Sequence, residues 1–148
     1  MPHFGLMNED ELGPEQAALM RARLHIRGGK RRLSQGKISA GILTLYDALL
    51  FGMEWFVLSD DRRETLMVHE QDNLRNDRDT YAVLVRSGVL DGRFDYAAFD
   101  SLVEYASNNE MPDYDYPPLV GSIDSVMTQL GIMPFDESQL PPEDPKTF

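Results

Sequence analysis

The chain of 148 residues contains no cysteine, only three histidines and only one tryptophan. Without thiols it has no disulfide, no thiolate zinc site, no iron–sulfur ligation and no cysteine nucleophile. This composition fits a reducing compartment, and no basic-then-apolar leader follows Met1. We therefore expect a cytoplasmic protein.

The histidines and acids lack the spacings that metal centres and catalytic sites require. His3, His25 and His69 fall in no Glu-x-x-His or His-Glu-x-x-His motif. The acid-rich stretches 72–79 and 113–115 do not match a calcium loop, and no serine lies in an elbow motif. The sequence therefore predicts no catalytic residue, no metal and no cofactor.

Long hydrophobic runs are also scarce. Residues 38–58 are long enough to cross a membrane, but Asp47 and Glu54 interrupt them, and each acid costs about 2–3 kcal/mol near a bilayer centre. We interpret this stretch as a central buried helix and expect no membrane contact. Its apolar residues recur at intervals of four and three along two adjoining stripes: Ile38, Ile42, Leu45, Leu49, Gly52 and Phe56, then Leu43, Tyr46, Leu50, Met53 and Val57.

Helical periodicity recurs in other segments, and no alternating strand pattern competes with it. We predict an all-α fold, a four- to five-helix bundle over residues 13–133 built around the central helix at about 38–58. An arm, residues 1–12, precedes the bundle, and an irregular, acidic, Pro-rich tail, residues 134–148, follows it as a mobile or surface-draped segment.

Local signals predict where the helices begin and end. The first helix should begin at Gly13-Pro14 and end either at Gly28 or at Ser34. Later helices should be capped at their starts by Asp61 in a capping box, by Asn76 and by Asp95, and should end at Gly88 and Gly131. Residues 69–80 form either one exposed helix or two pieces joined near Asn76.

Charge is distributed unevenly along the chain. The net charge of −11 disfavours nucleic acid, because phosphate binding needs a positive surface. From residue 95 to the end there are eleven acids and only one base, Lys146. From residue 21 to residue 37 there is no acid and there are seven bases: Arg21, Arg23, Arg27, Lys30, Arg31, Arg32 and Lys37.

The string at residues 27–32 is the first candidate ligand site. Arg27, Lys30, Arg31 and Arg32 surround two glycines, an arrangement that can wrap a phosphate or an acidic peptide. It is not a Walker loop, which needs a hydroxyl after its lysine and a preceding strand. The alternative is a solvated turn whose cations pair with the acidic C-terminal third, either within one chain or in a dimer.

Two further candidates are an Arg–His pair and an aromatic loop. Arg63 and His69 on one helix would lie about 120° apart around its axis, so an exposed surface pair is the alternative to a phosphodiester site. Tyr114 and Tyr116, in the Pro-rich loop 111–118, either anchor that loop to the core or form a patch for a partner.

Two strings resemble HEPN-like helical-bundle proteins. Residues 36–58, with Ala40, the run Leu45-Tyr46-Asp47-Ala48 and Leu50, resemble the second helix of that superfamily. Residues 84–91, where a helix ends at glycine and another helix follows, resemble its later segment, together with Phe99, Leu102 and Tyr105. The two strings cover less than half of the chain, and the resemblance implies a helical bundle.

The resemblance also bears on activity. Active members close the later helix with an Arg-x4-6-His motif that acts on RNA, whereas residues 107–114 here have Ser107 at the arginine position and no histidine after it. The cation that would stabilise a phosphorane-like charge is therefore missing.

The sequence thus predicts a non-catalytic binding protein that contacts a protein partner, or a second copy of itself, through the basic segment or the acidic tail. The alternative is a HEPN-like ribonuclease or nucleotide-binding protein that uses Arg63, His69 or the cluster at residues 30–32. A third hypothesis, a carboxylate-bridged metal enzyme, lacks the Glu-x-x-His pairs that it needs.

Overall fold

The structure is a computed structural model that describes residues 9–147. This part of the chain is all-α, as predicted, and contains no strand. Five longer helices and one single-turn helix are followed by two short 3-10 turns: α1 (Glu9–Ser34), α2 (Ile38–Leu58), α3 (Asp60–Arg63), α4 (Asp77–Arg86), α5 (Tyr96–Asn108), α6 (Pro117–Leu130), η1 (Glu137–Gln139) and η2 (Pro145–Thr147).

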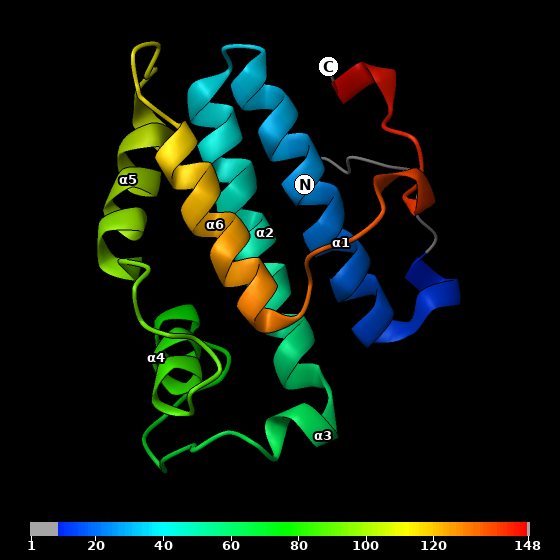
Figure 1. The fold of residues 1–148 in the computed structure, drawn as a ribbon, viewed down its shortest axis with the longest axis vertical. Coiled ribbons are helices and arrows are strands. Elements are labelled where there is room, and N and C mark those ends of the chain that lie inside the picture. The colour runs from blue at the N-terminus through cyan, green and yellow to red at the C-terminus, as the bar shows by residue number, and fades with distance from the viewer. Residues whose placement is uncertain (1–8, 148) are drawn as a thin grey trace.

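Helix α2 is the central element, as its two apolar stripes predict. It packs against α1, α3, α4, α5 and α6, and α1 lies antiparallel beside it in Figure 1. Within residues 9–147, α2 is the one helix with the length and composition to cross a membrane, and half of its apolar window is buried against other helices. The side chains of Ile42, Leu45, Ala48 and Leu49 are fully buried there.

Two glycines bring α1 and α2 into close contact. A Cβ atom at Gly41 would lie 2.7 Å from the Cγ and Cδ2 atoms of Leu33, and one at Gly29 would lie 2.7 Å from Cδ2 of Leu45. Each helix therefore offers a glycine notch that a buried leucine of the other helix fills. Leu45 packs on Gly29, and α1 therefore stays helical past Gly28 and Gly29. It ends at Ser34, the later of the two predicted ends.

Most of the predicted helix ends are confirmed. The side chains of Asn76 and Asp95 accept hydrogen bonds from the backbone N–H groups three residues further on, at 3.1 and 2.9 Å. Gly88 follows the end of α4 and Gly131 caps α6, and both have the left-handed φ angles, 79° and 94°, that such ends require.

One predicted helix start is wrong, and another is confirmed in part. The long part of α1 begins after Gly13, as predicted, because Gly13 breaks the helix with a φ of 74°, but a short helical piece from Glu9 precedes it where an arm was expected. Ser59, not Asp61, caps α3 by accepting a hydrogen bond from the backbone N–H of Arg62 at 3.3 Å, and α3 ends after one turn. Residues 64–76 are irregular, because from residue 69 to residue 76 Leu74 alone could form a buried apolar face.

The glycine notch at Gly41 gives a stability prediction. Gly41→Ala should lower the free energy of unfolding by about 1–3 kcal/mol, because the new methyl group overpacks against Leu33 by more than helix propensity gains. At this chain length that change lowers Tm by about 2–4 °C per kcal/mol, which thermal unfolding measures.

The matched control is Gly121→Ala in α6. A Cβ atom at Gly121 would meet nothing within 4 Å, so only helix propensity acts and Tm should stay constant or rise. Equal Tm values for the Gly41→Ala and Gly121→Ala proteins would contradict the notch.

Candidate functional site

The basic candidate segment lies in a helix and not in a turn. Arg27, Lys30, Arg31 and Arg32 occupy the last two turns of α1. Lys30 Nζ contacts the carboxylate of Asp124 in α6 at 2.9 and 3.0 Å, and both side chains are about one-third exposed. Arg32 points to α2, where its Nη1 lies 3.5 Å from Oγ1 of Thr44, and burial lowers its pKa.

Three arginines spaced four residues apart hold the C-terminal tail along one stripe of α1. Their contacts are Arg23 Nε to the Ile132 carbonyl at 3.1 Å, Arg27 Nη2 to the Pro141 carbonyl at 2.7 Å, and Arg31 Nε to both carboxylate oxygens of Glu143 at 3.0 and 3.1 Å. Arg23 also lies over the ring of Phe135. The tail is therefore draped along α1 through residue 143.

This arrangement favours the second interpretation of the basic segment. Its cations pair with the acidic C-terminal third of the same chain, as the charge asymmetry led us to expect. In the ion pair between Arg31 and Glu143, the two side chains are only 14% and 13% exposed. A phosphate or an acidic peptide would have to displace the chain's own carboxylates from this face.

Arg63 and His69 do not form a site together. Arg63 ends α3, donates to the Val57 carbonyl at 3.2 Å and pairs with Asp60. His69 lies beyond α3 in the irregular segment, where its backbone N–H donates to Asp72 at 2.7 Å. The prediction that both residues lie on one helix is therefore wrong. Arg63 is also far from the basic segment, because α3 and the α1–α2 turn lie at opposite ends of α2, a helix of about 30 Å (Figure 1).

The structure instead forms a pocket of about 570 Å³ between α2 and residues 74–80. Its walls are mostly apolar, from Leu50, Phe51, Met53, Val57, Leu58 and Leu74. The polar lining consists of Asp47, Glu54, Arg75, Asp77 and Thr80. The two sides of the pocket, residues 47–58 and 74–80, are separate in the chain and share no motif, so the sequence did not predict the pocket.

Two of the lining carboxylates are partly withdrawn from water. Burial raises the pKa of Asp47, which lies on the one polar stripe of α2. Burial also raises the pKa of Asp77, although Asp77 begins α4, where the helix dipole favours a negative charge. Desolvation therefore outweighs both this dipole and the nearby Tyr46 hydroxyl, which lowers the pKa of Asp77.

Aromatic side chains pack next to Asp77. The Tyr46 hydroxyl lies near Asp77 and lowers the pKa of that carboxyl, while burial raises the pKa of the Tyr46 and Tyr96 phenols. Tyr81 stacks on Tyr96 with ring centroids 5.0 Å apart, and its own hydroxyl donates to the Phe94 carbonyl at 2.6 Å. Packed rings thus join α2, α4 and α5 beside Asp77.

The remaining polar lining groups do not suggest nucleophilic chemistry. The Thr80 hydroxyl bonds the carbonyls of Leu74 and Asn76 at 3.0 and 2.9 Å, and no histidine lines the pocket. Across residues 9–147, no group of three or more His, Asp and Glu side chains is placed to hold a metal ion. The pocket offers an apolar cavity with three carboxylates and one arginine, an environment suited to a cation with an apolar body.

Comparison with known proteins adds no relative: no family model, no curated protein and no solved structure matches the chain. The class that the fold and the site define is an all-α helical bundle with an acidic, apolar-walled pocket. The resemblance to HEPN-like proteins stays a prediction.

The raised pKa of Asp47 predicts a pH dependence of stability. The unfolded chain keeps an aspartate pKa of about 3.9, so just above this pH the folded state binds more protons. The free energy of unfolding therefore falls as pH rises through this window and stays lower above it. Asp47→Asn should raise the free energy of unfolding at pH 7, and the gain should vanish below about pH 4, as urea denaturation across pH would measure.

Glu104→Gln, at an exposed position of α5, controls for the change in net charge. A gain at Asp47→Asn that is the same at pH 3.5 and pH 7 would show that the effect is not electrostatic.

The ion pair between Arg31 and Glu143, which holds the tail on α1, should have a measurable coupling energy. In a double-mutant cycle of Arg31→Ala and Glu143→Gln, the coupling energy should be about 1–2 kcal/mol, because this pair is largely buried and charge-assisted. The exposed pair Arg78–Asp100 is the control, with a coupling below about 1 kcal/mol. Equal couplings, measured by urea denaturation, would show that the tail is not held by this contact.

Proposed function

We propose that the protein is a non-catalytic binding protein whose pocket takes a cationic ligand with an apolar body. The observation that carries this proposal is the pair of partly buried carboxylates, Asp47 and Asp77, in the wall of an otherwise apolar pocket. An ammonium or guanidinium group beside these carboxylates would offset the hydration that they lose by burial.

The size of the pocket fits a small molecule or a single side chain of a partner. At about 570 Å³ it lies within the range of roughly 300–1,000 Å³ that is usual for ligand pockets. Its apolar walls contribute about 25 cal/mol for each Å² of apolar ligand surface that they cover. Affinity would therefore come from the apolar body and selectivity from the carboxylates.

Charge favours a cation over an anion. The lining carries three carboxylates, from Asp47, Glu54 and Asp77, against the single guanidinium of Arg75. The whole chain carries −11, which attracts cations over a distance at low ionic strength. The basic segment, which would be the natural site for an anion, is engaged by the tail.

Three probes with one phenylbutyl body test the proposal: 4-phenylbutylamine, 4-phenylbutanol and 4-phenylbutyrate. We expect the amine to bind at least about tenfold more tightly than the alcohol, and the acid to bind most weakly, because a charge-assisted hydrogen bond contributes about 1.5–3 kcal/mol. Isothermal titration calorimetry measures the three affinities.

Variants locate the binding. Asp47→Asn and Asp77→Asn should each weaken amine binding about tenfold and leave alcohol binding unchanged. Glu104→Gln, outside the pocket, should change neither. Equal affinities for the amine and the acid, or amine binding that survives in the Asp47→Asn/Asp77→Asn protein, would overturn the proposal.

A further inference from the structure

A groove runs along the outer face of α6, away from the pocket described above. Two hollows of about 380 and 300 Å³ lie side by side and share Phe94, Pro118 and Ser122 in their linings. The first lies between α5 and α6, and the second continues along α6 beside residues 91–94. Together they follow most of α6, a helix of 14 residues and about 21 Å.

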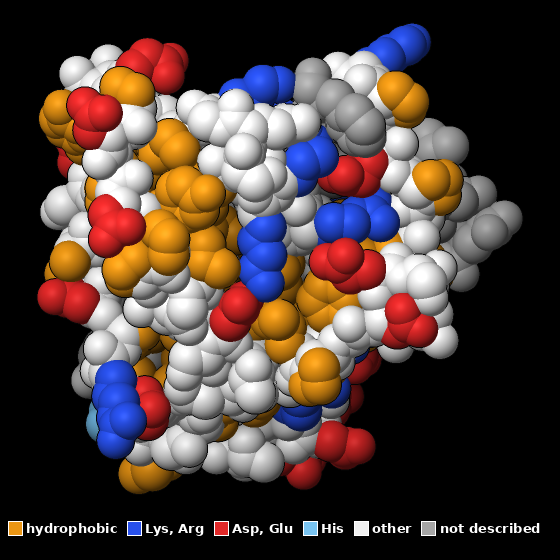
Figure 2. Space-filling view, turned by 45° about the horizontal axis from the view of Figure 1, so that its top comes forward, with side chains coloured by type: hydrophobic (Ala, Val, Ile, Leu, Met, Phe, Trp, Pro, Cys, Tyr) orange, Lys and Arg blue, Asp and Glu red, His pale blue; other side chains and the backbone are white. Residues whose placement is uncertain are grey.

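The two walls of this groove differ. Phe99, Leu102, Tyr114 and Leu119 provide an apolar wall, and Figure 2 shows hydrophobic side chains gathered between α5 and α6. The α6 wall is made of small residues spaced for one helix face: Pro118, Gly121, Ser122 and Ser125. A Cβ atom at Gly121 would meet nothing within 4 Å, so the backbone of another segment can approach α6 closely.

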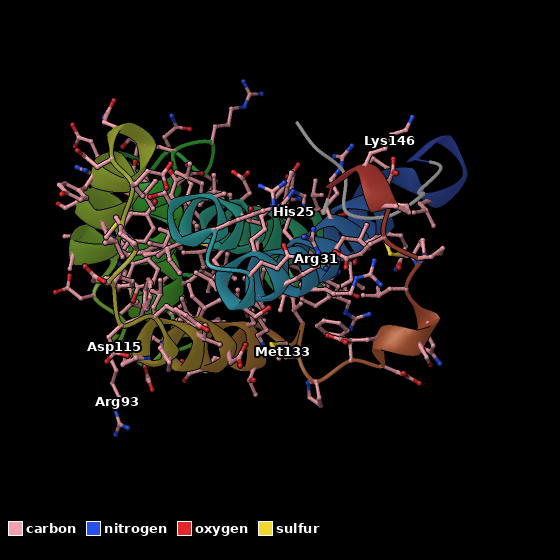
Figure 3. All side chains as sticks on the ribbon, turned by 90° about the horizontal axis from the view of Figure 1, so that it is seen from above. His25, Arg31, Arg93, Asp115, Met133 and Lys146 are labelled. Carbon is pink, nitrogen blue, oxygen red and sulfur yellow. The ribbon has the colours of Figure 1, made fainter. Side chains whose placement is uncertain are left out.

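The segments beside the groove are rich in acids. Residues 91–116 contain one base, Arg93, and seven acids: Asp91, Asp95, Asp100, Glu104, Glu110, Asp113 and Asp115. Asp91 and Asp95 line the hollows, and Asp113 and Asp115 flank Tyr114, which lines the first hollow. Figure 3 shows Asp115 and Arg93 on the α6 side of the molecule, where Arg93 points outward.

Two of these acids lack the pairing that the basic segment has. Among residues 9–147, neither Asp113 nor Asp115 has an ion pair or a side-chain hydrogen bond, whereas Lys30 and Arg31 are paired with carboxylates. The groove therefore combines an apolar wall with acids that remain available to cations from another molecule.

We propose that this groove docks an amphipathic basic α-helix of a partner protein. A helix of about 14 residues would place apolar side chains spaced i, i+3 or i+4, and i+7 against the half-buried Leu102 and Tyr114. Its lysines and arginines would meet the acids at the rim. Nucleic acid does not fit, because its phosphates would meet the same acids.

The occupant is a different protein and not a second copy of this chain. The basic helix face that this chain could offer is the stripe at Arg23, Arg27 and Arg31 of α1, and that stripe already holds the tail in the same chain. A second copy would have to release its own tail before its α1 could enter the groove.

Two model peptides test the proposal: a 14-residue helix with leucines on one face and lysines on the other, and the same peptide with glutamates in place of the lysines. Fluorescence anisotropy of the labelled peptides measures binding to the full chain. We expect the lysine peptide to bind at least tenfold more tightly than the glutamate peptide, and its binding to weaken as salt is raised.

Variants then place the peptide in the groove. Gly121→Gln puts a long side chain into open space on α6 and should weaken binding at least tenfold at unchanged Tm. The Asp113→Asn/Asp115→Asn protein should lose about three- to tenfold, and Arg93→Gln should gain about two- to fivefold. Asp47→Asn, in the other pocket, should have no effect.

Three results would overturn the proposal. The first is equal binding of the two peptides, and the second is unchanged binding of the lysine peptide to the Gly121→Gln protein. The third is a concentration-dependent dimer of the unliganded chain, seen by light scattering, that Gly121→Gln disrupts, because a second copy would then be the occupant.

Discussion

The close contact between α1 and α2 is the constraint on which the other features of the structure depend. Gly29 and Gly41 allow each helix to receive a leucine of the other, so α1 stays helical to Ser34. Only a continuous helix places Arg23, Arg27 and Arg31 on one stripe. A third notch, at Gly52 of α2, receives Ile132 just after α6 and so sets where the tail leaves toward that stripe.

The sequence predicted the parts of the fold that depend on local signals. The stripes of α2, the caps at Asn76 and Asp95 and the end at Gly131 are each readable within a few residues. The glycine pair of α1 was ambiguous, because helix propensity counts each glycine as a cost of about 1 kcal/mol, whereas a contact from another helix decides the outcome. The pocket was missed for a similar reason, although an acid inside the most apolar helix, Asp47, was a signal for it.

The two proposals share one electrostatic cause. The chain has 25 acids and 14 bases, and half of those bases lie between residues 21 and 37. Folding directs several of that group inward, onto Asp124, Glu143 and the tail carbonyls. Acids therefore outnumber bases in residues 91–116 and in the pocket lining, and both of these surfaces attract cations.

Preorganisation distinguishes the pocket from an acidic surface patch. Asp77 lies at the start of α4 next to Tyr46, and Tyr46 packs on Phe99 with ring centroids 6.0 Å apart. Because these groups are already ordered, a ligand would not have to order them, and that entropic cost is absent from binding. Burial has also stripped part of the water from Asp77 before any ligand arrives. Binding of a cation therefore requires less further desolvation of this carboxylate.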